Sequence, residues 1–412
     1  MIFILREKTQ LTTGFFCIER VLMIDVSVAD LTLFSHAFGS PEIKGVYKVL
    51  PEDFVVEEQI AFELSGEGEH LWCWVEKTGE NTDWVLQQLA KWANVPSSKV
   101  GVAGQKDRHA VTRQWFSIHL PRRADPCPSD FKIDRVSILK TVRHHRKLQT
   151  GGLSGNRFTL IIRDLHEENG TEDIVARLQA RLQRIKSEGV PNYFGAQRFG
   201  MYGRNIKQGI KLLAGELPKV KRNQKSMYLS SIRSWMFNVL LSHRVANGSW
   251  NQLLLGDVLQ LQGSNKWFLD DGSLDLKKRV EELDIHPTGA LYGKGMLPTQ
   301  QEALRLERAV ANEFFQWIQG LEDYGVQQDR RALRVLPLGL EWRWLDDEET
   351  GDALAKVSRV FSPQEEGALW MNRPALQLSF TLRSGSYATM VLRELCWASD
   401  YQENLKKQKI SQ

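Results

Sequence analysis

The order of strand-like and helix-like segments restricts the folds open to this chain of 412 residues more than any other feature. Runs rich in β-branched and aromatic residues are typical of strands, and they occur towards both ends of the chain, at 54–64, 70–75, 115–120, 157–163, 332–345 and 376–395. Apolar residues at helical spacing predict helices at 82–95, 171–187 and 230–245. Strands and helices do not alternate strictly, as a βαβ sheet requires, so the pattern predicts an α+β fold.

The middle of the chain differs in texture from both ends. Residues 190–335 begin with a basic, turn-rich stretch and continue through the predicted helix at 230–245. Strand-like sequence returns in strength only at 332–345. A length of 412 residues is enough for two hydrophobic cores. The arrangement therefore predicts one domain inserted between the two halves of another.

The charges of the chain are segregated, although the formal net charge of +4 is too small to identify a partner. Residues 140–163 hold six lysines and arginines and no acid, and residues 198–233 hold nine against one acid. Residues 341–352 hold six acids and one arginine. Such segregation fits either a face that binds a polyanion or two solvated basic faces, and charge alone does not decide between them.

Cysteines and apolar runs bear on the compartment. The four cysteines are Cys17, Cys73, Cys127 and Cys396. They show neither CxxC spacing nor a Cys/His cluster, which argues against disulfides or a zinc site and fits a reducing cytoplasm. No apolar run approaches the roughly 18 residues of a membrane span. Charged residues interrupt the apolar N-terminus, unlike a signal peptide. We favour Met23 as the initiator, with residues 1–22 either an upstream misread or a disordered tail.

One carboxylate, Asp107, stands between Lys106 and Arg108 in the stretch GVAGQKDRHAVTRQWF (101–116). An acid flanked by two cations in a turn is most often a surface ion pair. An ionised carboxylate is also a nucleophile or a base, and neighbouring cations keep its pKa low. Gly104 permits a tight turn from which Asp107 protrudes. From these residues alone, the ion pair is the stronger interpretation.

Longer motifs change that balance. The stretches GQKDRHAVTRQ (104–114), KLQTGGLSGNRF (147–158), VPNYFGAQRFG (190–200) and RSGSYATMVLREL (383–395), with PEDFVVEE (51–58), resemble the TruD family of transfer-RNA pseudouridine synthases. The resemblance runs in family order from about residue 44 to 400. It implies isomerisation of a uridine in transfer RNA, at position 13 of the D arm, without cofactor or metal. Asp107 matches the essential aspartate of the family.

The resemblance also implies a pocket for the uridine. Phe54, Asn156, Phe158 and Tyr387 match family positions that line it. An aromatic ring offers a surface for base stacking, and an asparagine amide both donates and accepts hydrogen bonds. For Phe54 and Phe158, packing in the core is an equally good interpretation. We expect Lys106 to support Asp107 electrostatically, because an ordinary lysine is a poor acid near neutrality.

Contacts with the RNA backbone are expected at four basic residues: Arg143, Arg146, Lys147 and Arg198. The adjacent pair His144 and His145 suggests a metal site at first sight. Neighbouring residues on a strand point in opposite directions, however, and no third ligand follows at suitable spacing. We therefore expect phosphate contacts or a solvated loop here, and no metal.

The resemblance implies the architecture as well. A pseudouridine-synthase-type catalytic domain, with a mixed or antiparallel sheet and flanking helices, is expected at 38–186 and 336–404. An inserted α+β TRUD domain is expected at 187–335, an N-terminal extension at 1–37, and a short tail at 405–412. The expected state is a cytoplasmic monomer that binds transfer RNA and needs no obligate protein partner.

Two other functions remain open from the residues. A non-catalytic RNA-binding or chaperone protein would keep the basic stretches but would not need Asp107. An RNA N-glycosidase would share the first bond cleavage and then admit water. Glycosidases generally use two carboxylates that flank the bond, whereas this motif offers one acid between two cations.

Overall fold

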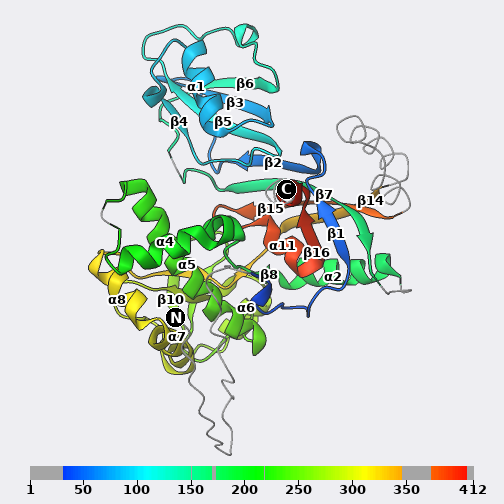
Figure 1. The fold of residues 1–412 in the computed structure, drawn as a ribbon, viewed down its shortest axis with the longest axis vertical. Coiled ribbons are helices and arrows are strands. Elements are labelled where there is room, and N and C mark those ends of the chain that lie inside the picture. Colours follow the sequence, from blue (N-terminus) through cyan, green and yellow to red (C-terminus); the bar gives the residue numbers. More distant parts are fainter. Residues whose placement is uncertain (1–30, 150, 169–172, 218, 346–372, 406–412) are drawn as a thin grey trace, which may run out of the picture.

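A computed structural model describes residues 31–149, 151–168, 173–217, 219–345 and 373–405. It combines sheets of ten, four and two strands with helices, which confirms the α+β class (Figure 1). Residues 1–22, most of the acidic run 341–352, and the tail except residue 405 lie outside the described part of the chain.

The ten-stranded sheet is mixed and forms the larger unit. Seven strands follow the order β14-β15-β7-β2-β5-β3-β6, while β4 pairs with β5, and β1 pairs with both β7 and β16. The strands are β1 (Lys44–Tyr47), β2 (Phe54–Gln59), β3 (His70–Thr78), β4 (Val100–Val102), β5 (Val111–His119), β6 (Val136–His144), β7 (Gly155–His166), β14 (Leu338–Leu345), β15 (Ala375–Arg383) and β16 (Trp397–Asp400).

Two of the strand pairs in this sheet are parallel, and both lie near the site described below. β2 runs parallel to β5, the strand that follows Asp107. β1 runs parallel to β16, so that Tyr47 is paired with Asp400. The remaining pairs in the sheet are antiparallel.

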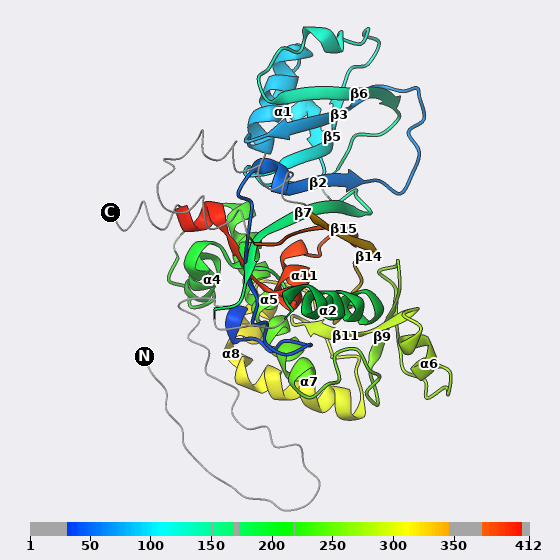
Figure 2. The same ribbon diagram turned by 90° about the vertical axis from the view of Figure 1, so that its right-hand side faces the viewer.

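Helices cover the sheet in two places. α2 (Ile174–Glu188) and α11 (Ala388–Leu395) pack against β2, β7 and β15, and the core between them includes Leu160, Leu182, Leu376 and Val391. In Figure 2 both helices lie below the sheet. α1 (Thr82–Trp92) covers β3 and β5 at the far end of the sheet over a separate core that includes Leu71, Leu89 and Phe116.

A second unit is built around one long buried helix, α5, and a four-stranded sheet in the order β10-β9-β11-β12. Its core gathers Ile232, Trp235 and Phe237 from that helix. Its elements are α3 (Ala196–Phe199), α4 (Arg204–Leu213), α5 (Arg222–Ala246), β9 (Val258–Leu261), β10 (Trp267–Leu269), α6 (Leu276–Glu281), β11 (Ile285–Leu291), α7 (Gln301–Glu313), α8 (Phe315–Asp323) and β12 (Asp329–Ala332).

The chain enters and leaves this second unit at one place. β8 (Val190–Pro191) pairs antiparallel with β13 (Arg334–Val335), so the two connections lie side by side. On this basis we propose 187–335 as the inserted domain and 38–186 with 336–404 as the domain it interrupts. The N-terminal extension expected at 1–37 is not free throughout, because Phe34 is 2% exposed and stacks on Tyr193 in the core of the inserted unit.

Two predicted segments differ from the structure. The strand-like stretch 376–395 is a strand only as far as Arg383, and after a turn its second half forms α11. The reason is the spacing of the buried residues Ala388, Val391, Leu392 and Leu395, which is helical. The helix predicted at 171–187 is α2, which begins at Ile174.

The side chain of Thr82 makes contacts beyond its own helix. The N-cap position of α1 is Asn81, and Thr82 is the first residue of the helix. The hydroxyl of Thr82 donates to Gln114 Oε1 at 3.2 Å and accepts from the amide of Lys106 at 3.0 Å. Thr82 therefore ties α1 to the loop that carries Asp107.

Candidate active site

Asp107 lies in the loop between β4 and β5, and its side chain and backbone are both fixed. Its Oδ1 accepts a hydrogen bond from the amide of His109 at 2.9 Å. Its carbonyl accepts from Nζ of the buried Lys77, also at 2.9 Å. The side chain remains 25% exposed, so a ligand can reach it. The turn does not depend on Gly104, which has open space around it and no left-handed backbone.

Lys48 supplies the positive charge beside this carboxylate. Its Nζ lies 2.5 Å from Asp107 Oδ2 and 2.9 Å from Asp400 Oδ2. The side chain of Lys48 is only 4% exposed, and its ammonium lies over the ring of Phe54, 4.7 Å from the ring centroid. Lys48 follows β1 and Asp400 ends β16, so residues from both ends of the chain meet at Asp107.

These contacts set the protonation states. Burial raises the pKa of Asp107, but the charge and hydrogen bond of Lys48 and the amide of His109 outweigh burial, and the pKa lies below its ordinary value. Burial lowers the pKa of Lys48, yet Asp400 and Asp107 together raise it above its ordinary value. Asp107 is therefore ionised at neutral pH and able to act as a nucleophile or a base.

A cavity of about 340 Å³ opens beside Asp107. This volume falls near the lower end of the range for small-molecule sites, about 300–1,000 Å³. The lining residues come from both units of the molecule, since Gln197 belongs to α3 and the others to the larger unit: Lys48, Gln105, Lys106, Asp107, His109, Gln197, Asp400, Gln402 and Glu403.

Lys106 lines the cavity but has a different partner from the one expected. Its Nζ lies 2.6 Å from Oε1 of the buried Glu58, and Arg108 Nε donates to a backbone carbonyl at 2.8 Å. Neither flanking cation pairs with Asp107. The charge that lowers the pKa of this carboxylate comes chiefly from Lys48, not from the flanking cations that we expected to lower it. The charge of Lys106 is compensated beneath the cavity instead.

Phe54 and Phe158 lie together at the edge of the core next to Lys48. Their ring centroids are 6.2 Å apart in an edge-to-face arrangement, and each residue is 7% exposed. Phe158 also packs against Phe380. Core packing thus accounts for most of their surface. Neither ring lines the cavity at Asp107, although Phe54 contacts Lys48, which does.

Asn156 lies on β7 directly opposite Glu58 of β2. Its Oδ1 is buried and accepts no hydrogen bond within the described part of the chain. A buried amide oxygen without a donor is uncommon, because losing its hydration is costly. Asn156 does not line the cavity at Asp107, but its amide oxygen is an acceptor without a donor.

Tyr387 lies against the inserted unit, and the cavity around Asp107 is not lined by it. Its ring contacts Phe194 edge to face, with centroids 6.3 Å apart. It also covers Gly195, where a Cβ atom would lie 3.0 Å from the ring. Close packing with Tyr387 thus explains the glycine at position 195.

A buried ion pair fixes the segment that leads into Phe54. Arg163 on β7 donates three hydrogen bonds of 2.7 to 3.2 Å to the carboxylate of Asp53. The same carboxylate accepts from the amide of Leu50 at 3.0 Å. The two side chains are 6% and 0% exposed. This pair holds the turn between Lys48 and β2 in place.

We expect Arg163→Met to lower the free energy of unfolding by about 3–5 kcal/mol, because it leaves the carboxylate of Asp53 buried and unpaired. Chemical denaturation at neutral pH measures the loss. Arg157→Met is the matched control on the same strand, since Arg157 is exposed, and its effect should stay within about 0.5 kcal/mol. Equal effects of the two substitutions would contradict the anchoring role of Arg163.

One known protein family matches most of the chain. The family described as tRNA pseudouridine synthase D (TruD) matches residues 31–219 and 212–395. The chain belongs to the TruD family. The match covers the Asp107 loop, β2, β7 and the segment around Tyr387.

Curated members of the TruD family are similar over nearly their full length. The tRNA pseudouridine synthase D of Hydrogenovibrio crunogenus is 49% identical over 365 residues, which are 89% of this chain and 96% of that protein. The protein of the same name from Methylococcus capsulatus is 41% identical over 361 residues, covering 87% and 93%.

A solved structure, that of a TruD protein from Methanosarcina mazei, has the same fold. It superposes with a TM-score of 0.63 over 88% of this chain and 95% of its own, at 20% sequence identity. At that identity the likeness concerns the fold alone. It supports the combination of a mixed sheet with helices seen in Figure 1.

Of the basic residues expected to contact RNA, some are held by contacts within the protein and others are exposed. Arg143 is engaged internally, since it donates to the carbonyls of residues 68, 120 and 123 and pairs with Asp125. These contacts favour a structural role. Arg146 and Lys147 are exposed. Arg198 donates to the hydroxyl of Ser230 at 3.1 Å.

The described residues contain no group of three or more His, Cys, Asp or Glu that could hold a metal ion. His144 instead stacks on Phe62, with ring centroids 5.4 Å apart. No helix in the described ranges is long and apolar enough to cross a membrane.

Sequence reasoning missed the residues that surround Asp107. Lys48, Lys77 and Asp400 were not candidates, although each contacts Asp107 or its cation. The one available signal was the position of Lys48 shortly before the PEDFVVEE motif of the TruD family. For Lys77 and Asp400 nothing in the sequence indicated the contact, which depends on strand pairing.

Proposed function

We propose that the chain converts uridine to pseudouridine in transfer RNA. The observation that carries the proposal is the ionised Asp107, fixed by Lys48, in a cavity that both units of the molecule border. The two curated relatives described above bear the name of this activity. Family membership and the geometry of the carboxylate thus support the same chemistry.

The reaction is an isomerisation and needs no oxidant or reductant. The N1–C1′ bond of the nucleotide breaks, the uracil turns, and a bond forms between C5 and C1′. C5 then loses its proton and N1 takes one up, so the atoms balance. Asp107 acts on the nucleotide as a nucleophile or as a base, and its low pKa keeps the charged form available. Lys48 and the amide of His109 hold the carboxylate in one orientation.

The uridine must leave its base stack to reach Asp107, which requires polar and aromatic groups to receive it. Asn156 offers its unpaired amide oxygen to an N–H of the uracil. Phe54, Phe158 and Tyr387 offer ring surfaces, and base stacking on a ring contributes about 1–3 kcal/mol. Arg146, Lys147 and Arg198 are the basic residues that we assign to the RNA backbone.

We assign the substrate position to uridine 13 in the D arm, as the family resemblance implies. Incubation of the purified protein with unmodified transfer RNA, followed by carbodiimide treatment and primer extension, maps every pseudouridine formed. We expect one stop next to position 13. A transfer RNA with cytidine at that position should give none. Modification at other positions only would contradict this assignment.

The same experiment distinguishes the two other functions. A non-catalytic RNA-binding protein would bind the transfer RNA and leave its uridines unchanged. An N-glycosidase would release free uracil and leave an abasic site, which blocks primer extension without carbodiimide. Asp400 and Glu403 line the same cavity as Asp107, so the number of carboxylates does not separate an isomerase from a glycosidase. Release of free uracil is the result that decides between them.

We further propose that the protein acts as a monomer in the cytoplasm. Both units that border the cavity at Asp107 are parts of the same polypeptide, which fits a monomer. The described cysteines Cys73, Cys127 and Cys396 are free thiols, which fits a reducing compartment.

A further inference from the structure

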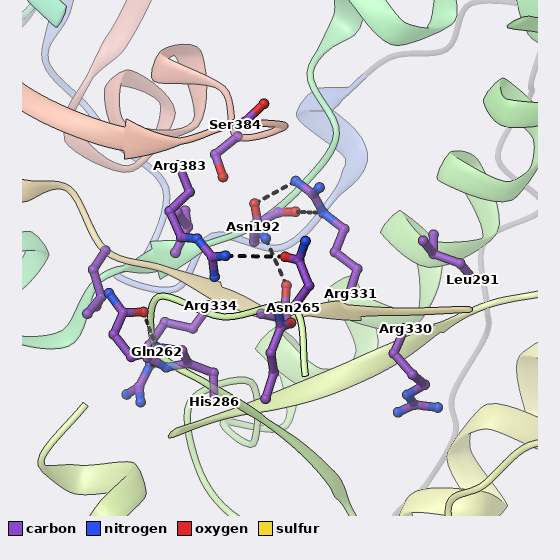
Figure 3. A pocket seen from close by; sticks show the side chains of 15 residues that line it. Asn192, Gln262, Asn265, His286, Leu291, Arg330, Arg331, Arg334, Arg383 and Ser384 are labelled. Atoms are coloured by element: carbon purple, nitrogen blue, oxygen red, sulfur yellow. Dashed lines mark hydrogen bonds between the residues drawn. The ribbon is translucent and has the colours of Figure 1, made fainter. Parts of the chain in front are cut away.

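A second cavity, of about 180 Å³, lies at the junction between the inserted unit and the larger sheet (Figure 3). Four arginines line it, three from the β12–β13 segment and one from the end of β15: Arg330, Arg331, Arg334 and Arg383. No carboxylate lines it. His286 is neutral there, because burial and the charge of Arg334 lower its pKa to about 3.

Three of these arginines form no ion pair within the described part of the chain, although the charge of Glu188 acts on Arg334 from a distance. Arg330 is compensated by Glu307, 2.8 Å away, and Figure 3 shows it apart from the others. Arg331 donates to the carbonyl and side-chain oxygens of Asn192. The remaining two donate to neutral acceptors only: Arg334 to His286 Nδ1 and the carbonyls of Val280 and Ile285, and Arg383 to the carbonyl of Ser264 and Asn265 Oδ1.

Such a concentration of positive charge favours an anion. Burial lowers the pKa of Arg331 and Arg334 to about 10, so both remain charged at neutral pH. The planar fork of a guanidinium group matches the oxygens of a phosphate, and phosphate is a common partner of clustered arginines. Since one water occupies about 30 Å³ of liquid, the cavity has room for a phosphate group.

The cavity adjoins a residue assigned to the uridine. Ser384 and Ser386, which line it, belong to the turn that leads directly into Tyr387. From the other side, the guanidinium of Arg331 lies 4.0 Å from the centroid of Phe194, whose ring also contacts Tyr387. The arginine cavity therefore adjoins Tyr387, one of the residues that we assign to the uridine.

We propose that this arginine cavity binds one phosphodiester group of the substrate RNA, close to the nucleotide whose base meets Asp107. The proposal rests on the function proposed above. The arginines have a simpler role if they only tie the inserted unit to the sheet, as Arg383 does through Ser264 and Asn265. If the arginines only connect the two units, their loss lowers the stability of the fold. If they bind a phosphate, their loss changes the salt dependence of RNA binding.

The first test compares Arg383→Gln with Lys278→Gln, a control that removes the same charge from a side chain 74% exposed on α6. Both are made together with Asp107→Asn, which stops turnover, and binding to unmodified transfer RNA is titrated at several salt concentrations. Loss of one phosphate contact should flatten the slope of log K against log salt by about 0.9 and weaken binding about tenfold. Lys278→Gln should leave both unchanged. Equal slopes for Arg383→Gln and the control would overturn the proposal.

A second test does not require Arg383→Gln to fold normally. Single methylphosphonate linkages, which carry no charge, replace successive phosphates around the target uridine in the RNA. We expect one linkage to weaken binding of the Asp107→Asn protein about tenfold, and the same linkage to have no further effect on the Arg383→Gln double variant. Uniform small losses along the RNA would contradict a dedicated site.

Free phosphate provides the remaining comparison. If inorganic phosphate raises the melting temperature through Arg383 while no linkage of the RNA is sensitive, the cavity serves a free anion, and the RNA assignment is wrong. Because these tests measure binding, they remain informative if the wild-type protein forms no pseudouridine. The absence of pseudouridine would count against the proposed function. The methylphosphonate linkages would still decide whether the arginine cavity binds a phosphate of the RNA.

Discussion

Asp107→Asn is expected to lower kcat/KM for pseudouridine formation by at least about a thousandfold, because an amide serves neither as a nucleophile nor as a base. The side chains are nearly the same size, and Lys48 keeps its second carboxylate partner, Asp400. The fold should therefore survive the change. Pseudouridine formed in unmodified transfer RNA at limiting enzyme concentration measures the effect.

Glu403→Gln is the matched control for this variant, since Glu403 is an exposed acid that lines the same cavity. We expect it to change kcat/KM less than about tenfold. Transfer RNA binding by Asp107→Asn should stay within about threefold of the wild type, because the RNA backbone contributes most of the affinity. If Asp107→Asn retained a tenth of the activity, Asp107 would not be the reacting group.

Lys48→Met is expected to have the second largest effect, on both stability and activity. It leaves Asp107 and Asp400 facing one another in a partly buried site without their shared cation. Breaking such a pair costs about 3 kcal/mol of the free energy of unfolding. Activity near neutral pH should fall at least about tenfold, because the carboxylate loses the contact that orients it.

The pH dependence of stability separates the electrostatic role of Lys48 from a general loss of stability. In the wild type the pKa of Asp107 is lowered, so its ionisation stabilises the fold above the ordinary value of 3.8, and the gain is lost as pH falls through the lowered pKa. In Lys48→Met the burial of Asp107 and the charge of Asp400 raise this pKa instead. The stability difference between the two proteins should therefore be largest near neutrality and shrink in acid.

The pH dependence of activity should also reflect the raised pKa of Asp107 in Lys48→Met. The acidic limb of kcat/KM moves to higher pH in Lys48→Met, so part of the lost activity returns as the pH is raised. Lys44→Met serves as control, because Lys44 is 44% exposed on β1 and pairs with an exposed acid, Glu168. An activity loss in Lys48→Met that is equal at every pH would contradict the electrostatic role.

The sequence predicted the parts of the structure that depend on local pattern. The period-two alternation after residue 157 gives β7, and helical spacing gives α2 and most of α5. The change of texture after residue 190 coincides with β8, where the chain enters the second unit. Family motifs drew attention to Asp107, which lines a cavity as a catalytic group must.

Contacts between distant segments could not be predicted from one sequence. Lys106 is adjacent to Asp107 along the chain, yet it turns to Glu58, while Lys48 reaches Asp107 across 59 positions. The strand-like residues after 387 form a helix because a turn at the end of β15 redirects them onto the core. Arginine commonly contacts RNA, which made Arg143 a candidate. In the structure, however, carbonyl groups that only the folded loops bring together surround Arg143.

The parallel pairing of β1 with β16 has a consequence for biosynthesis. Lys48 is made early, but its partner Asp400 is translated 352 positions later. Domains begin to fold while the ribosome is still at work, starting from the N-terminal side. Until Asp400 is translated, the ammonium of Lys48 has at most one of its two carboxylate partners, and β1 cannot pair with β16. The second ion pair of Lys48, with Asp400, is therefore completed only when nearly the whole chain has been made.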